Sequence, residues 1–441
     1  MVNSLKMKML YVTLGLITAS SASAKVYVNS MCTMRANSQN KVIDGDNNKD
    51  DKFPLASISK VVTTLWAIEK LGPDYRFTTK LHVNRVGNNA YDVHIEGSRD
   101  PLISRNTGYF LVSELNRAGI DIKNIERLSF DENFLINWGL EEHPGIDTPY
   151  YRTMQAQVEA VRGQLVANFI TPIDFGKNSA YNILKARAAK IGVSMESTPK
   201  INVRQVEFVS KKDFVKQADT TTLLYRSTPL KTILKRMNNQ SNNYIADNLY
   251  WNLGGTSEFN KYLQSSLSLS TNEMEFYLGS GNNADYILNP GGKAVYNEAT
   301  CEAMIKVLYK LDKSLEAKGL QLSDVMAVAG KDNTSTVAEK YGYGGVFAGS
   351  TVAKTGSVDK AKTLAGTVST AKGEIYFVVL MNTDGRSEWG SASGVIKEKV
   401  KNLINSNGGP KDIGYKNEII ALPFDAASKL QNAANISLGK K

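Results

Sequence analysis

Ser57 and Lys60 lie three positions apart at the start of an apolar stretch, FPLASISKVVTTLWAIEK, which begins at Phe53. Residues at this spacing share one face of a helix, so the Lys60 amine can reach the Ser57 hydroxyl. A serine is a weak nucleophile until a base takes its proton, and a lysine can be that base when burial or a nearby cation lowers its pKa. The pair therefore predicts nucleophilic catalysis in which Ser57 attacks and Lys60 acts as the general base.

The S-x-x-K spacing alone is a weak signal because it recurs in this chain. Other matches begin at Ser38, Ser197, Ser357, Ser369 and Ser437. These matches lie in polar turns, in a hairpin, in the tail or across a proline, which spoils a helix. Only Ser57 combines a helix start with a buried continuation.

Two further motifs follow along the chain. Ser241 and Asn243 form S-x-N at a polar break between two predicted helices, and K-T-G-S begins at Lys354 on a predicted strand. S-x-x-K, S-x-N and K-T-G in this order are the motif set of penicillin-interacting serine enzymes. S-x-N also begins at Ser38, Ser270 and Ser280; we prefer Ser241 because its motif enters a helix.

The K-T-G-S residues are expected to bind substrate. Lys354 can bring a second cation toward Lys60 and attract a substrate carboxylate. The hydroxyls of Thr355 and Ser357 can donate to that carboxylate, and Gly356 lets the strand backbone approach closely.

The other predicted catalytic groups act on the reacting bond. The backbone N–H groups of Ser57 and Ser357 can form an oxyanion hole. Ser241 can relay a proton to the leaving amine. Asn243 can hold Lys60 and the substrate amide.

Composition and the N-terminus indicate an exported globular protein. The chain has 441 residues, a formal net charge of +10, 42% apolar and 22% charged residues. Residues 1–24 have the pattern of a secretory signal peptide, which predicts a periplasmic location, and no later stretch is long enough for a transmembrane anchor. The basic charge suits an anionic partner such as cell-wall polymer, whereas no basic block interleaved with aromatic residues indicates nucleic acid.

Cysteine and histidine usage gives no indication of a metal or other cofactor. The histidines His82, His94 and His143 are scattered outside any zinc-binding pattern. Export would permit a disulfide between Cys32 and Cys301, but two separate buried thiols are equally compatible with the sequence.

Strand-like runs at both chain ends and helices between them predict an α+β fold. We expect one antiparallel sheet, built from both chain ends and packed on helices, with a helical region beside it. The catalytic domain is predicted to comprise residues 25–75 and 223–441. Residues 76–222 are predicted to form an inserted, smaller α/β domain.

The sequence resembles the class C low-molecular-mass penicillin-binding proteins, which include D-alanyl-D-alanine carboxypeptidases and endopeptidases. The resemblance is carried by FPLASISKVVTTLWAIEKLGPDYRFTT, SNNYIADNLYWNLGG and VFAGSTVAKTGSVDKAKTLAGTVSTAKGEIYFVVLMN. It implies a penicillin-binding transpeptidase-like domain, peptidoglycan peptides as substrates, an acyl-enzyme on Ser57, and β-lactam antibiotics as covalent inhibitors. In endopeptidases of this family the bond cut is the D-alanyl cross-link between stem peptides.

Three segments depart from the family pattern. A "GGDP"-like run reads GSRDP from Gly97, a "DGSGLSR"-like run reads LGSGNNAD from Leu278, and a "GTL"-like segment reads GKDNTST from Gly330. The insertion is also short for the larger members of the family, so we expect one inserted subdomain to be missing. The cleft would then be more open, which would favour cross-linked polymer over free pentapeptide as the substrate.

Two other functions stay open at this level. A serine β-lactamase shares the motifs, although the long insertion argues against it. A non-catalytic wall-binding or sensor protein could keep the scaffold, although such a protein has no need of Lys60.

Overall fold

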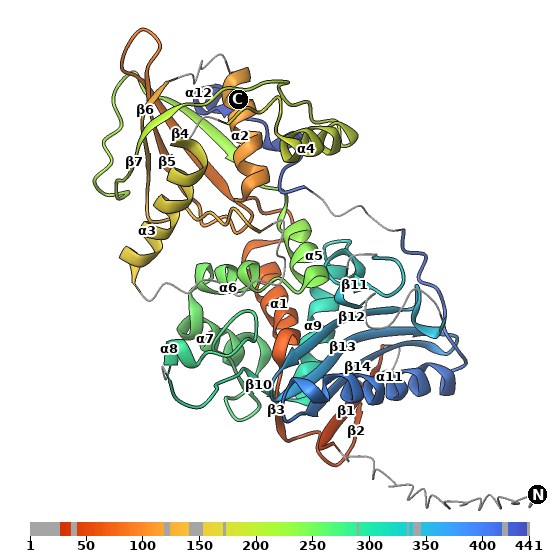
Figure 1. Cartoon of the computed structure of the whole chain (residues 1–441). Helices are drawn as coiled ribbons and strands as arrows, with labels where there is room; N and C mark the ends of the chain where they lie inside the picture. The colour runs from red at the N-terminus through yellow and green to blue at the C-terminus, as the bar shows by residue number, and fades with distance from the viewer. Residues whose placement is uncertain are drawn as a thin grey trace, which may run out of the picture.

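Strands from both ends of the chain lie side by side in one sheet, as the sequence predicts (Figure 1). The structure is a computed structural model that describes residues 27–36, 42–118, 124–140, 153–170, 173–288, 291–332, 335–337, 345–416 and 422–438. The predicted signal peptide, 1–24, lies outside these residues, as does His143.

This first sheet is antiparallel throughout, in the order β11-β12-β13-β14-β1-β2. Its strands are β1 (Asn29–Arg35), β2 (Ile43–Gly45), β11 (Ala327–Val328), β12 (Thr351–Val358), β13 (Ala361–Thr370) and β14 (Gly373–Asn382). Buried residues run almost without interruption along β12, β13 and β14. Such runs indicate a sheet covered on both faces.

Helices cover the two faces of this sheet. One face packs with α1 (Ser59–Leu71) and α9 (Cys301–Glu316) in a large apolar core, and the other packs with α11 (Trp389–Ser406). In α1 every residue from Ser59 to Ile68 is buried, so the expected central helix is confirmed. It also contacts α5 (Leu230–Gln240) and α6 (Asn243–Asn252), which form the neighbouring helical region.

A small sheet fixes the approach to α1. Its strands, in the order β3-β10-β9, are β3 (Lys52–Pro54), β10 (Glu298–Thr300) and β9 (Met274–Glu275). β3 leads into the 3₁₀ turn η1 (Ala56–Ile58), and Leu55 N–H donates to Asn297 O at 2.8 Å. The helices α7 (Gly255–Leu267) and α8 (Asp285–Leu288) lie in the same half of the molecule.

The segment between α1 and α5 forms a second sheet with its own core, above the first in Figure 1. Its order is β15-β8-β4-β5-β6-β7. Its strands are β4 (Thr78–Arg85), β5 (Tyr91–Glu96), β6 (Ile125–Phe130), β7 (Val203–Phe208), β8 (Thr221–Arg226) and β15 (Gln431–Asn432). Its helices are α2 (Arg105–Arg117), α3 (Met154–Leu165) and α4 (Ser179–Lys190), with a π-helical turn η2 (Val166–Ile170). The pairs β5–β6 and β6–β7 are parallel, so helical crossovers must connect them.

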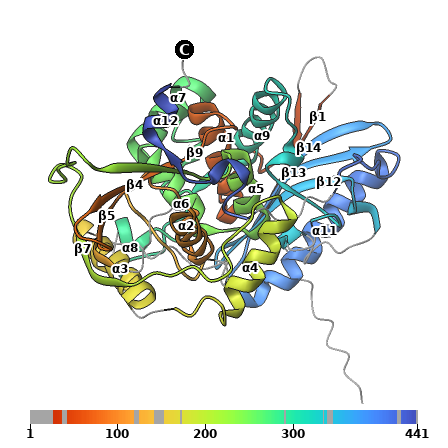
Figure 2. The same cartoon turned by 90° about the horizontal axis from the view of Figure 1, so that it is seen from above.

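The C-terminal segment packs on this second sheet and not on the first. Phe424 stacks on Phe110 with ring centroids 4.1 Å apart, and β15 pairs with β8. The short helix α12 (Ala433–Leu438) lies beside the same sheet (Figures 1 and 2). The domain division at 75/76 and 222/223 stays a prediction, but residues 422–438 contribute to the second core. Two isolated apolar residues in a tail have no periodicity from which this packing could be predicted.

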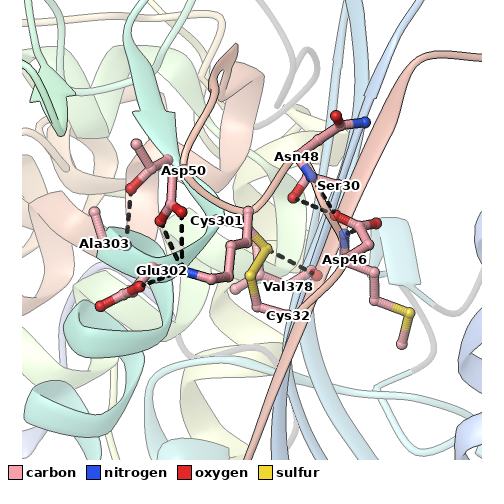
Figure 3. The surroundings of a disulfide bond; sticks show 12 residues. Ser30, Cys32, Asp46, Asn48, Asp50, Cys301, Glu302, Ala303 and Val378 are labelled. Atoms are coloured by element: carbon pink, nitrogen blue, oxygen red, sulfur yellow. Dashed lines mark hydrogen bonds and ion pairs between the residues drawn. A yellow bond between two sulfur atoms is a disulfide. The ribbon is translucent and has the colours of Figure 1, made fainter. Parts of the chain in front are cut away.

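A disulfide joins Cys32 of β1 to Cys301, the first residue of α9 (Figure 3). Both cysteines are fully buried, and their Cα atoms are 5.8 Å apart. The sequence left open whether Cys32 and Cys301 form a disulfide or stay as separate thiols, and the structure shows the disulfide. The bond ties the first strand to a helix that packs on α1.

Within the described residues, no helix combines the length and the apolar character needed to cross a bilayer.

Candidate active site

Ser57 lies in η1, immediately before α1, and Lys60 lies on the first turn of that helix. The Lys60 Nζ and Ser57 Oγ atoms are 2.9 Å apart and hydrogen-bonded. Lys60 is fully buried, whereas Ser57 is partly exposed. The spacing thus places the two groups together, with the hydroxyl accessible and the amine protected from water.

The turn that presents Ser57 is strained. Ala56 has a φ of 50°, a left-handed conformation that is uncommon for a residue with a side chain. Gly281 packs against it so closely that a Cβ at this position would lie 2.0 Å from Ala56 O. Backbone strain of this kind persists where the surrounding structure enforces it, often at functional sites.

Two oxygen atoms besides Ser57 Oγ are hydrogen-bonded to the Lys60 amine. Its Nζ donates to Asn243 Oδ1 at 2.7 Å and to the carbonyl oxygen of Ser280 at 3.0 Å. Asp247 accepts from Ser280 N–H at 2.7 Å, which fixes the loop that carries this carbonyl. Lys60 is therefore positioned by α6 and by the 278–281 loop as well as by its own helix.

The S-x-N motif occupies the break between α5 and α6. Ser241 follows α5 in a left-handed conformation (φ 54°), and the Asn242 side chain caps α6 by accepting from Ile245 N–H. Ser241 Oγ accepts from Lys354 Nζ at 2.9 Å. The rival Ser270 instead bonds to Glu273, so the structure brings Ser241 and not Ser270 to the K-T-G-S strand.

The K-T-G-S residues lie on β12 beside the Ser57 turn. Lys354 is fully buried and also donates to Thr355 O at 2.7 Å. A Cβ on Gly356 would lie 3.0 Å from Ser57 N and 2.1 Å from Thr363 Oγ1, so this close approach requires glycine. β12 therefore passes close to the backbone nitrogen of Ser57.

All eight residues predicted from the motifs thus come together at one site. Sequence reasoning missed further groups at this site, which are Thr336, Lys362, Thr363 and the Ser280 carbonyl. Thr336 Oγ1 lies 2.9 Å from Thr355 Oγ1, and Lys362 Nζ donates to Ser357 Oγ at 2.5 Å. The only signal for Ser280 was its weak S-x-N match, and that motif concerns its side chain.

The GSRDP segment, which differs from the family's "GGDP"-like run, has two unusual residues. Arg99 has a φ of 56°, and the neighbouring Asp100 is 1% exposed. Asp100 Oδ1 accepts from Leu102 N–H at 2.8 Å, while its Oδ2 has no hydrogen-bond partner among the described residues. Burial raises the pKa of Asp100 to about 7, because a buried carboxylate loses hydration that one hydrogen bond does not replace.

This pKa predicts how stability depends on pH. The unfolded chain ionises Asp100 near pH 3.8, whereas the folded chain keeps the proton until about pH 7. The contribution of Asp100 to the free energy of unfolding is therefore fully present below pH 3.8 and is lost as pH rises through 7. The loss is at most about 4 kcal/mol. Asp100→Asn should become more stable relative to wild type as pH rises from 4 to 8, measured by urea unfolding. The surface exchange Asp74→Asn is the control, and a pH-independent difference for Asp100→Asn would contradict the assignment.

The fold and the site define the class as a serine enzyme of the penicillin-binding type. The model of the D-Ala-D-Ala carboxypeptidase 3 (S13) family matches residues 27–163 and 176–397. The chain belongs to this family and is a serine-type DD-peptidase with the α+β penicillin-binding fold and an inserted part. No curated protein sequence matches it.

Solved structures of high similarity come from Bdellovibrio bacteriovorus. Bd3459, a predatory peptidoglycan endopeptidase, is 60% identical, with a TM-score of 0.86 over 93% of this chain and 100% of its own. The predatory endopeptidase Bd0816, in complex with immunity protein Bd3460, is 52% identical, with a TM-score of 0.85 over 92% and 100%. Bd3459 has also been solved acylated by penicillin G in complex with Bd3460. Penicillin-binding protein 4 of Haemophilus influenzae, solved in complex with a β-lactam, is 18% identical, with a TM-score of 0.58 over 86% of this chain and 96% of its own, and shares the fold.

Proposed function

We propose that this chain is a DD-endopeptidase that cuts D-alanyl cross-links of peptidoglycan through an acyl-enzyme on Ser57. The observation that carries the proposal is the contact of Lys60 Nζ with Ser57 Oγ, beside Lys354 and Ser241. Two relatives that are more than half identical to this chain, Bd3459 and Bd0816, are endopeptidases, which supports this choice over simple carboxypeptidase activity.

In the proposed acylation step, Ser57 Oγ attacks the D-alanyl carbonyl while its proton moves to Lys60 Nζ. The backbone N–H groups of Ser57 and Ser357 stabilise the oxyanion. The carbon–nitrogen bond then breaks, and Ser241 gives its hydroxyl proton to the leaving amine while it takes up the proton that Lys60 had accepted, so Lys60 becomes a neutral amine again. Lys354 donates to the Ser241 hydroxyl oxygen during this relay. The result is an ester on Ser57 and a free amine.

In deacylation, a water molecule attacks the Ser57 ester and gives its proton to Lys60. Collapse of the intermediate returns the proton to Ser57 Oγ and releases a peptide that ends in a D-alanine carboxylate. Asn243 keeps Lys60 in place in both steps through the 2.7 Å hydrogen bond.

We infer that the signal sequence in residues 1–24 exports the enzyme to the periplasm, where peptidoglycan is accessible. We also infer that an immunity protein of the kind bound to Bd3459 and Bd0816 can bind this chain. Pull-down by purified Bd3460 tests this partner, and loss of wall cleavage in its presence is the expected result.

Purified cross-linked muropeptide dimers test the proposed reaction. The enzyme should convert them to monomers, identified by mass, and prior incubation with benzylpenicillin should block the conversion. Trimming of soluble pentapeptides while dimers stay intact would show a carboxypeptidase instead. Rapid hydrolysis of benzylpenicillin would indicate a β-lactamase, and a stable adduct without any peptide cleavage would indicate a binding protein.

A further inference from the structure

Lys362 is a buried cation beside the proposed substrate-binding strand. It is 4% exposed and lies on β13, directly opposite Ser357 of β12. Its Nζ donates to Ser357 Oγ at 2.5 Å and lies 5.2 Å from the centre of the Trp389 ring. Trp389 is itself fixed to β12, because its Nε1 donates to Val358 O at 3.0 Å.

This contact determines how the Ser357 hydroxyl can act. An ammonium group has only donors, so Ser357 Oγ must accept from Lys362. The hydroxyl hydrogen of Ser357 is then directed away from Lys362 and can be donated to another acceptor. Lys362 therefore orients Ser357 as a donor and places a positive charge behind it.

The accessible side of Ser357 is the substrate side. Ser357 is the one residue of β12 that is not buried. Among the described residues, β11 pairs with β12 only at Val352 and Ala353, which leaves this edge without a strand neighbour from Lys354 onward. The Ser57 backbone approaches β12 at Gly356, the residue before Ser357, because a Cβ on Gly356 would lie 3.0 Å from Ser57 N.

The proposed reaction places a negative charge at this position. When a D-alanyl bond is cut, the residue that leaves as the amine can carry a carboxylate on the carbon next to that nitrogen. A hydroxyl donor backed by a buried cation is suited to a carboxylate, because charge-assisted hydrogen bonds are stronger than neutral ones.

We propose that Lys362 is a positioning residue that makes the enzyme select substrates with a free carboxylate beside the cleaved amide nitrogen. The inference rests on the proposed peptidase reaction and specifies the substrate class of that site. Peptides in which this carboxylate is amidated are then poor substrates.

The test compares two cross-linked dimers that differ only in a carboxylate or a carboxamide at this carbon. Wild type should cleave the carboxylate form faster. Lys362→Met should lower kcat/KM for the carboxylate form about 10- to 100-fold and for the carboxamide by less than about threefold. Lys360→Met, an exposed lysine of the same hairpin, should change neither value, and Lys362→Arg should restore part of the preference.

A second measurement does not depend on peptide cleavage. The rate of acylation by benzylpenicillin is compared with that by its methyl ester, in wild type, Lys362→Met and Ser357→Ala. Both variants should lose the preference for the free acid. If wild type cleaves neither dimer, the proposed function fails. The ratio of the two acylation rates, with the free acid and with the methyl ester, still tests the role of Lys362.

Equal losses on both substrates in Lys362→Met would show a purely structural role and overturn the inference. An unchanged preference for the carboxylate would overturn it as well. If Lys362→Met does not fold, the test uses Lys362→Arg and Ser357→Ala instead. The measured quantity is the ratio of acylation rates with benzylpenicillin and with its methyl ester. A Ser357→Ala variant that keeps the full preference for the free acid would exclude a role for the oriented Ser357 hydroxyl.

Discussion

Ser57→Ala should form no covalent adduct with benzylpenicillin and should cleave cross-linked dimers at least about 10⁴-fold more slowly than wild type. The reason is that the variant has no oxygen to carry the acyl group, while the other groups of the site remain in place. Intact-protein mass spectrometry measures the adduct, and release of monomers measures cleavage.

The fold of Ser57→Ala should be unchanged, because this side chain is partly exposed and lies in the short turn η1. Ser59→Ala is the matched control. Its hydroxyl is buried and accepts from Asn297 Nδ2 at 3.0 Å, so its loss should reduce stability by about 1 kcal/mol without preventing the adduct. An adduct that persists in Ser57→Ala, mapped for example to Ser241, would mean that the nucleophile has been misassigned.

The sequence predicted the elements whose patterns are local. The apolar run around Lys60 could only be a central helix, and the runs in 350–382 could only be buried strands. Both were found, as α1 and as β12 to β14. The three motifs could be placed on these elements because each consists of side chains at fixed spacing.

Other parts of the site depend on backbone atoms or on neighbours distant in sequence. The Ser280 carbonyl holds Lys60, and any residue type supplies a carbonyl. Lys362 looks like an ordinary strand lysine until β13 is paired in register with Ser357. The packing of Phe424 on Phe110 likewise depends on a return of the chain across 314 positions, for which no local pattern exists.

Lys60→Met should lower the rate of Ser57 acylation about 10³- to 10⁴-fold, the range expected for loss of a general base with its positioning. Methionine matches the length and the burial of the lysine stem, so the helix should form. The variant leaves Asn243 Oδ1 and the Ser280 carbonyl without their donor, which should cost about 1–3 kcal/mol of stability. Stopped-flow acylation by a chromogenic cephalosporin measures the rate.

The arrangement around Lys60 is suited to a neutral amine. Asn243 Oδ1 and the Ser280 carbonyl are both acceptors, so they can take the two hydrogens of an –NH₂ group. A neutral amine with its two hydrogens placed in this way would have its lone pair available for the Ser57 hydroxyl proton, because the Nζ and Oγ atoms are only 2.9 Å apart.

Lys60→Arg separates this role from that of a fixed cation. Arginine keeps the charge but does not lose its proton in proteins, so it cannot act as the base. If Lys60 is the base, Lys60→Arg should be as slow as Lys60→Met, and the residual rate of both should rise with pH as hydroxide replaces the missing base. If Lys60 served only to attract the substrate, Lys60→Arg would keep most of the rate. Activity near wild type in that variant would therefore exclude the lysine-base mechanism while leaving Ser57 as the nucleophile.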